Sequence, residues 1–299
     1  LHLSIRRQRQ MCIRDSPVTV LIGSIRDKKR LDEVFETYHP TVVFHAAAHK
    51  HVPLMEISPA EAVKNNVLGT KNLLTSASEH DVERFVQLST DKAVNPTSVM
   101  GCTKRICEML IQTFAGNTDM KCVAVRFGNV LGSHGSVIPL FEAQIKKGGP
   151  VTLTDPNIER YFMTIPEAAQ LVLQAGALAE GGSIYVLDMG EPVKIMDLAK
   201  QLIRFYGYEP GVNMEIKIVG LRPGEKLYEE LMMDEEQGKM RRTEHNKIFV
   251  ASPRDIDLAV FYQQLQDLAA AAQHNDEGVV DQLEKMIPTF TPTRKNLKV

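Results

Sequence analysis

An acid and a base stand side by side at Asp91 and Lys92, directly after the β-type run RFVQLST (84–90). If this run is a strand of a parallel sheet, its C-terminal end opens into the crevice where such sheets bind their ligands. A carboxyl group and an amine at that place would supply the two partners of an acid–base reaction on one substrate. The spacing alone leaves an ordinary charged turn equally open.

A second lysine follows on the next predicted helix, which runs from about Thr97 to Phe114. Lys104 comes four residues after Met100, so both side chains project from one helix face. A thioether cannot take a proton, which excludes Met100 from proton transfer. From spacing alone, Lys104 is equally well explained as a solvated charge.

Composition excludes several classes of protein. Hydrophobic residues make up 43% and charged residues 24% of the 299 residues, which is typical of a packed protein rather than a disordered or fibrous one. The charges nearly cancel, with 35 Lys and Arg against 37 Asp and Glu, so no basic field favours nucleic acid as a partner. No apolar run approaches the ~20 residues of a membrane-spanning helix.

The elements that must position the acid and the base alternate between strands and helices. Strands are predicted at 18–23, 41–47, 84–90 and 121–128, and helices at 31–38, 59–79 and 97–114. This alternation indicates right-handed βαβ crossovers and a mostly parallel sheet.

Beyond residue 128 the alternation loosens. Helices are predicted near 137–147, 166–179, 193–206, 255–272 and 276–286, with short strands near 151–154, 183–187 and 214–219. The expected fold class is therefore α/β, with a doubly wound, mostly parallel sheet and a smaller C-terminal substrate lobe.

Histidines and cysteines do not form a metal motif. His45, His49 and His51 are close in sequence, but no cysteine or carboxylate cluster completes a ligand set and HEXXH spacing is absent. We expect no metal. Cys102 and Cys107 fit the pattern of small buried side chains, and four cysteines without a CxxC pair favour a reducing compartment.

Six segments, taken together and in this order, resemble the extended short-chain dehydrogenase/reductase superfamily. Within it they look like the CapD-like nucleotide-sugar 4,6-dehydratases of bacterial polysaccharide biosynthesis. The segments are HAAAHKHVPLME (45–56), NNVLGT (65–70), STDKAVNPTSVMGCTK (89–104), RFGNVLGSHGSVIP (126–139), PNIERYFMTI (156–165) and GLRPGEKLYEEL (220–231). The superfamily's usual Tyr-x-x-x-Lys is Met100-x-x-x-Lys104 here, as in the membrane-anchored subgroup that this chain resembles.

The resemblance implies a reaction and roles for its residues. NAD takes a hydride from C4 of UDP-N-acetylglucosamine, water is lost across C5 and C6, and the hydride returns to C6. Thr90 would bond the C4 oxygen, Asp91 would protonate the departing hydroxyl, and Lys92 would remove the C5 proton. Lys92 then has to be neutral, which requires a depressed pKa. Met100 and Lys104 complete the catalytic set, with Lys104 on the nicotinamide ribose.

The same resemblance implies binding residues. For the NAD cofactor they are Ser24, Ile25, His45, Ala46, Ala47, Asn66, Ser89 and Lys104, and for the UDP-sugar they are Lys50, Asn129, Val137, Thr152, Arg160, Arg222 and Glu225. Ser24 stands where the family has an aspartate that accepts from the adenine amine. Arg160 and Arg222 would make charge-assisted bonds to phosphates.

We expect four segments along the chain. Residues 1–16 hold four arginines and no apolar period and are predicted to be extraneous. A partial NAD-binding Rossmann-like domain (17–135), a substrate-binding lobe with interleaved elements (136–250) and a helical tail (251–299) follow. No G-x-G-x-x-G turn occurs, which predicts an N-terminally truncated fold that binds NAD poorly.

The resemblance leaves three functions open and implies a setting. A 4,6-dehydratase is favoured by Asp91 and Lys92, whereas a UDP-sugar 4-epimerase needs no base at C5. A non-catalytic nucleotide-sugar-binding domain is the third. The protein is expected to be cytoplasmic and a homo-oligomer. Its parent would sit at the cytoplasmic face of the inner membrane, contacting the membrane only through a missing N-terminal region.

Overall fold

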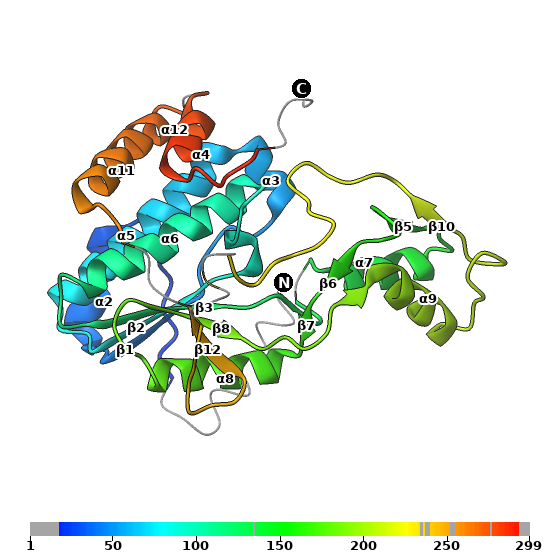
Figure 1. Cartoon of the computed structure of the whole chain (residues 1–299), viewed down its shortest axis with the longest axis horizontal. Helices are drawn as coiled ribbons and strands as arrows, with labels where there is room; N and C mark the ends of the chain where they lie inside the picture. Colours follow the sequence, from blue (N-terminus) through cyan, green and yellow to red (C-terminus); the bar gives the residue numbers. More distant parts are fainter. Residues whose placement is uncertain are drawn as a thin grey trace.

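The structure, a computed structural model, describes residues 18–133, 135–233, 236, 240–251, 255–275 and 277–292. The expectation that residues 1–16 are extraneous lies outside the described residues. Two lobes are visible, a larger one around a central sheet and a smaller one beside it (Figure 1). Among the described helices, none combines the length and the apolar character that crossing a membrane requires.

The central sheet contains six strands and is parallel over its first four. Its spatial order is β1 (Val42–His45), β2 (Arg84–Leu88), β3 (Lys121–Arg126), β8 (Ser183–Leu187), β12 (Ile248–Ala251) and β11 (Arg241–Arg242). The first four strands pair in parallel, whereas β12 and β11 pair antiparallel. All carboxyl ends of the parallel strands therefore open on one edge of the sheet.

Helices cover both faces of this sheet, which confirms the doubly wound class. One apolar layer joins the sheet to α2 (Lys28–Tyr38), α5 (Gly69–Glu79), α6 (Val99–Ala115), α11 (Leu258–Gln273) and α12 (Val279–Met286). The opposite face packs on α8 (Ile165–Ala177). Figure 1 shows α8 below the sheet and α5, α6, α11 and α12 above it.

The smaller lobe has its own apolar cluster. It is built from α7 (Val137–Lys146), α9 (Ile195–Phe205) and the parallel pair β5 (Val151–Leu153) and β10 (Ile216–Ile218). Short pairs connect it to the larger lobe: β4 (Asn129–Val130) with β7 (Phe162–Met163), and β6 (Glu159–Arg160) with β9 (Val193–Lys194). β8 and β12 fall within or next to the range 136–250, yet they are strands of the central sheet, and α8 from the same range packs on that sheet. The lobes therefore interleave along the chain.

Two expectations about the elements need correction. Residues 18–23 form no strand and are exposed, with Ile22 91% accessible. A strand needs a neighbour for its backbone groups, and no described strand pairs with this segment. The helix expected at 59–79 is present as α4 (Pro59–Ala62), a π-helical turn η1 (Val63–Leu68) and α5.

Candidate active site

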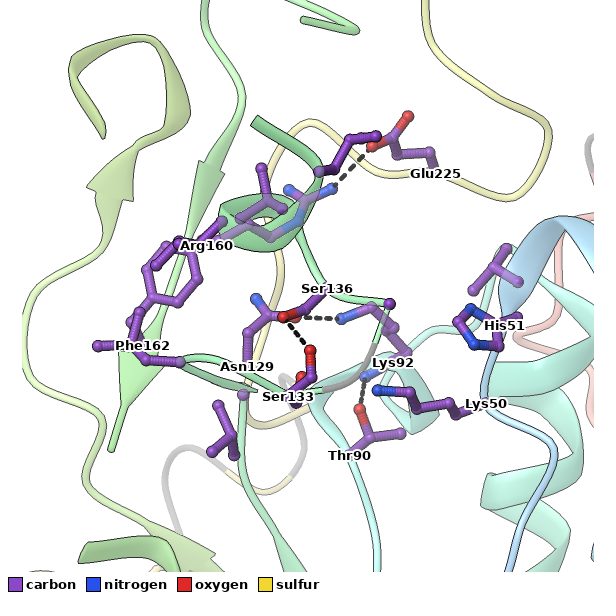
Figure 2. Close-up of a pocket in the computed structure, with 18 of the residues that line it drawn as sticks. Lys50, His51, Thr90, Lys92, Asn129, Ser133, Ser136, Arg160, Phe162 and Glu225 are labelled. Carbon is purple, nitrogen blue, oxygen red and sulfur yellow. Dashed lines mark hydrogen bonds and ion pairs between the residues drawn. The ribbon is translucent and has the colours of Figure 1, made fainter. Parts of the chain in front are cut away.

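A cleft of about 480 Å³ lies where the carboxyl ends of the parallel strands face the smaller lobe. Its walls come from the loop after β1, from the end of β2, from the first turns of α6, from β4 and from the segment 132–141. The loop 220–231 adds Arg222 and Glu225 on the small-lobe side. Figure 2 shows polar side chains from these separate elements converging on one space. The cleft is the site that the parallel topology predicts.

Thr90, Asp91 and Lys92 form a tight turn at the floor of this cleft. The turn is a short 3₁₀ helix, η2 (Asp91–Ala93), which Thr90 caps by accepting from the backbone N–H of Lys92. The Thr90 hydroxyl donates to Asp91 Oδ1 at 2.7 Å, and Lys92 Nζ donates to the same oxygen at 3.0 Å. Asp91 is fully buried, and its Oδ2 has no hydrogen-bond partner. A buried carboxylate oxygen without a partner is costly and calls for an explanation.

α6 is held against this turn by a glycine. Ser98 caps the helix by accepting from the backbone N–H of Gly101. A Cβ at position 101 would lie 2.2 Å from the carbonyl oxygen of Lys92, so only glycine allows this approach. Met100 and Lys104 thereby reach the cleft wall from the adjacent helix. Met100 is 5% exposed and joins the main apolar cluster, as a packing residue should.

The charge on Lys92 differs from what the base role requires. Lys92 Nζ lies 3.0 Å from Asp91 Oδ1, 3.4 Å from Asn129 Oδ1 and 3.5 Å from Glu229 Oε1. Burial and Arg160 lower the pKa of Lys92, but the carboxylates of Asp91 and Glu229 outweigh them and raise it above its ordinary value. In this geometry Lys92 is an ammonium, so the role of a base requires that it first lose a proton.

Glu229 belongs to the site and was missed from sequence. Its carboxylate is buried, with Oε1 near Lys92 and Oε2 without a hydrogen-bond partner. Burial raises its pKa and the nearby Asp91 adds to this, against the opposing effect of Lys92 and Arg160. The segment GLRPGEKLYEEL contains three glutamates, and only the folded loop shows that Glu229 turns inward.

Arg160 is largely committed to protein groups. Its guanidinium donates to the backbone carbonyls of Glu159, Lys226 and Leu227 at 2.7–3.0 Å. It also lies 3.8 Å from Glu225 (Figure 2) and 3.7 Å from Glu229. Arg160 still lines the cleft. Most of its N–H donors bond backbone carbonyls and hold the loop 220–231 in place, so they are not free to bind a phosphate.

The other residues predicted for the substrate lie on the cleft wall. Lys50, Asn129, Val137 and Thr152 all line it, from four different segments. Partial burial lowers the pKa of Lys50. Arg222 is exposed at the cleft, and its backbone N–H donates to the Glu225 carboxylate, which also accepts from Thr154. Of the two arginines, Arg222 has the freer side chain for an anionic ligand.

The residues predicted for the cofactor divide into two groups. Ser89, Ala46 and Lys104 line the cleft. Lys104 is buried and donates to the carbonyl of Leu88, and burial lowers its pKa. The Ser89 hydroxyl donates to the buried carboxylate of Glu108 at 2.7 Å. Small alanines and a buried ammonium provide space and a donor on this side of the cleft.

The second group lies away from the cleft wall. Asn66 holds the loop after β1 from beneath, because its side-chain amide accepts from His49 N at 2.7 Å and donates to His49 O at 3.1 Å. His45 is buried beside Thr70, and burial and Lys104 lower its pKa to about 3. Ala47 is exposed beyond the cleft, as is Ser24, whose hydroxyl accepts from Arg26 N. Ile25 packs on the main core.

Behind the floor, the larger lobe contains a buried charge network. Glu108 accepts from Arg126 at 2.8 Å and 3.0 Å and from Arg105 at 2.8 Å. Burial opposes ionisation, but the two arginines hold the pKa of Glu108 down at about 2. Arg126 also pairs with Glu236 at 2.8 Å. The network fixes Ser89 and hence the end of β2. Within the described residues no group of three or more metal-ligating side chains occurs.

Comparison with known proteins places this site in a family. Residues 3–253 match the model of a family described as polysaccharide biosynthesis protein. The capsular polysaccharide biosynthesis protein CapD of Staphylococcus aureus is 62% identical over 213 residues, which are 71% of this chain and 35% of CapD. The chain thus spans about a third of the length of that relative. UDP-glucose 4-epimerase of Rickettsia canadensis is 35% identical over 93% of this chain and 82% of the epimerase.

Solved structures share the fold. Pen from Bacillus thuringiensis is 36% identical with a TM-score of 0.76, covering 84% of this chain and 76% of Pen. A dTDP-glucose 4,6-dehydratase of Streptomyces venezuelae, solved with NAD bound, has a TM-score of 0.69 at 20% identity over 93% of this chain and 86% of the dehydratase. This second likeness shows the Rossmann-like fold alone. The family match spans most of the chain, and the chain belongs to the polysaccharide biosynthesis protein family of the extended short-chain dehydrogenase/reductase superfamily.

Proposed function

We propose that the protein is an NAD-dependent 4,6-dehydratase that converts UDP-N-acetylglucosamine to its 4-keto-6-deoxy sugar for polysaccharide synthesis. One observation carries the proposal. Lys92 lines the cleft and pairs with the buried Asp91, and the adjacent helix presents Met100 where a tyrosine would serve a simple redox reaction. An acid and a base are what elimination of water requires, in addition to hydride transfer.

The cleft fits the nicotinamide end of the cofactor. Lys104 is a buried ammonium whose hydrogen-bond acceptor is the backbone carbonyl of Leu88, and it can also donate to ribose hydroxyls. Ala46 and Ala48 leave room beside it. No G-x-G-x-x-G turn precedes a helix among the described residues, so we assign no contact to the pyrophosphate. NAD, when bound, would accept the hydride from C4 and return it to C6.

The proton steps follow from two forms of the same pair. Asp91 and Lys92 share one proton, as carboxylate and ammonium or as carboxylic acid and amine. The ligand-free geometry favours the ion pair. Asp91 is already buried, so a sugar that displaces water from the cleft removes solvation only from the ammonium of Lys92, and this favours the neutral form.

The neutral form has the two functions that elimination needs. Once C4 is a ketone, the C5 proton is acidic and the Lys92 amine takes it. Asp91 gives its proton to the C6 hydroxyl, which leaves as water. The pair then stands again as carboxylate and ammonium, and the ammonium of Lys92 is the proton donor to C5 in the final reduction. The oxidation at C4 releases the proton of the C4 hydroxyl to solvent, and the pair takes one proton back from solvent after the reduction, which restores its starting state. Thr90, bonded to Asp91, is placed to bind the C4 oxygen.

The charge around the cleft suits a nucleotide sugar. Arg222 and Lys50 both line the cleft, and guanidinium groups bind phosphate oxygens through paired donors. Asn129 lines the cleft, and its side-chain oxygen accepts from Lys92. We infer that the diphosphate lies toward Arg222 and the sugar toward Lys92.

A UDP-sugar 4-epimerase is the second candidate, favoured by the Rickettsia relative at 35% identity. An epimerase returns the hydride to C4 and leaves C5 and C6 unchanged. A non-catalytic nucleotide-sugar-binding domain is the third candidate. Asp91 and Lys92 in one buried turn are unnecessary for either alternative.

Nuclear magnetic resonance of the reaction separates the three functions. The protein is incubated with NAD and UDP-N-acetylglucosamine, and sugar carbons are followed. Dehydration gives a C6 methyl group and a C4 ketone or its hydrate. Asp91→Asn and Lys92→Ala are each expected to lower turnover by about 10²–10⁴. A C4 epimer with an intact C6 hydroxymethyl group would overturn the proposal, and so would near-normal turnover in both variants.

A further inference from the structure

A buried carboxylate lies behind the proposed catalytic pair without lining the cleft. Glu229 is 8% exposed, and its Oε1 lies 3.5 Å from Lys92 Nζ and 3.7 Å from Arg160 Nε. Its Oε2 has no hydrogen-bond partner. Burying a carboxylate with so few hydrogen bonds costs free energy. A residue that serves only to stabilise the fold would not need this arrangement.

The loop 220–231 is fastened so that Glu229 faces inward. The guanidinium of Arg160 donates to the carbonyls of Lys226 and Leu227. The ammonium of Lys226 donates to the carbonyl of Val94 at 3.0 Å, just after the catalytic turn. Thr97 donates to the carbonyl of Gly224 at 3.0 Å. These hydrogen bonds tie the loop to the segment that carries Lys92, and they fix the position of Glu229.

The charges around Glu229 balance when all groups are ionised. Lys92 and Asp91 face it from η2, Arg160 faces it from β6, and Lys226 lies on its own loop beyond them. At the centre, the two cations Lys92 and Arg160 meet the two anions Asp91 and Glu229. Without Glu229, one carboxylate would face two cations, and the ammonium form of Lys92 would lose an attractive partner.

We infer that Glu229 is a positioning residue, which holds the ammonium of Lys92 as a second carboxylate beside Asp91 and so governs when Lys92 releases its proton. The inference rests on the proposed function in treating Asp91 and Lys92 as the reacting pair. Glu229 itself does not touch the substrate space. It acts through Lys92, and the loop 220–231 thereby links Arg222 and Glu225 at the cleft to the proton state of the pair.

The test measures the proton affinity of Lys92 without any turnover. The side chain of Lys92 is 23% exposed, so acetic anhydride can reach it. The rate of acetylation is followed against pH by mass spectrometry of the peptide that contains Lys92. Glu229→Gln removes one charge and keeps the shape, and its labelling midpoint is expected to fall by about 1–3 pH units.

Matched variants separate contact from general charge. Glu230→Gln removes an exposed carboxylate of the same loop, one that pairs with Lys226, and should leave the midpoint unchanged. Glu229→Asp keeps the charge and should restore most of the midpoint. Glu229→Ala also removes the charge and is measured in its place if Glu229→Gln fails to fold.

The outcomes are distinct. An unchanged midpoint in Glu229→Gln overturns the inference, as does an equal fall in Glu230→Gln. A lowered midpoint together with a protein that makes no keto sugar supports the role of Glu229 and refutes the dehydratase. With turnover present, the rising limb of kcat/KM against pH should move to lower pH in Glu229→Gln. A uniform loss of rate at every pH would show a merely structural role.

Discussion

Gly101 provides the sharpest test of how the fold positions Lys92. It lies in the first turn of α6, where this helix meets η2, the short helix that carries Lys92. A Cβ there would lie 2.2 Å from the carbonyl oxygen and 3.1 Å from the carbonyl carbon of Lys92. Both obstacles are backbone atoms, so no rotamer change relieves the contact. In Gly101→Ala the helix and the turn must move apart.

Two opposing effects set the magnitude. Alanine is favoured over glycine in a helix by about 1 kcal/mol, whereas overpacking in a close-packed region costs about 1–3 kcal/mol. Because the clash is with rigid backbone, we expect the upper part of that range and a net loss of about 1–2 kcal/mol in the free energy of unfolding. A shift of the Lys92 turn by about 1 Å would lower turnover by about 10²-fold.

Gly116 at the other end of the same helix is the matched control. It has right-handed helical backbone angles, and a Cβ there would meet its nearest atoms at 3.8 and 3.9 Å. Gly116→Ala should be neutral or stabilise by up to about 1 kcal/mol. Urea denaturation and turnover are measured for both variants. Equal stability and full activity in Gly101→Ala would refute the argument that this contact holds Lys92 in place.

Two further predictions concern the residues around the pair. Met100→Leu is close to isosteric, so it should keep most of the turnover and cost less than about 1.5 kcal/mol in stability; a loss as large as that of Lys92→Ala would show that the thioether acts chemically. The pKa of Glu108 is about 2 in the folded protein against an ordinary 4.5, so ionised Glu108 stabilises the folded state by about 3 kcal/mol. This contribution is complete above pH 4.5 and is lost as the pH falls toward 2. In Glu108→Gln the free energy of unfolding should be lower at neutral pH and fall less steeply over that range, as acid-dependent urea denaturation will measure; equal slopes would contradict the assignment.

The long periodic elements were predictable from sequence because their own residues determine them. The helix predicted at 97–114 is α6 to within two residues at its start and one at its end, and 183–187 is β8 without change. The run 18–23 has the same β-branched character, yet it forms no strand. β12 was missed because four residues carry little periodicity and their antiparallel pairing with β8 depends on a partner far away in the chain.

The candidate site was predictable as far as its residues share a strand end. Lys92 and Lys104 line the cleft as the parallel topology requires, and the buried Asp91 bonds Lys92 from within the protein. The inward turn of Glu229 depends on Arg160 and the fastened loop, which no local pattern reveals. For the same reason the raised pKa of Lys92 could not be predicted, since the two carboxylates that raise it, Asp91 and Glu229, lie on segments far apart in the chain.

Solvent isotope incorporation tests the central claim most directly. The protein converts UDP-N-acetylglucosamine in deuterated water, and the product is examined by nuclear magnetic resonance at C5 and C6. If Lys92 removes the C5 proton and an acid expels the C6 hydroxyl, the product carries deuterium at C5 and a methyl group at C6, and Lys92→Ala gives neither. A product epimeric at C4 that retains its C5 hydrogen and its C6 hydroxyl would contradict the account.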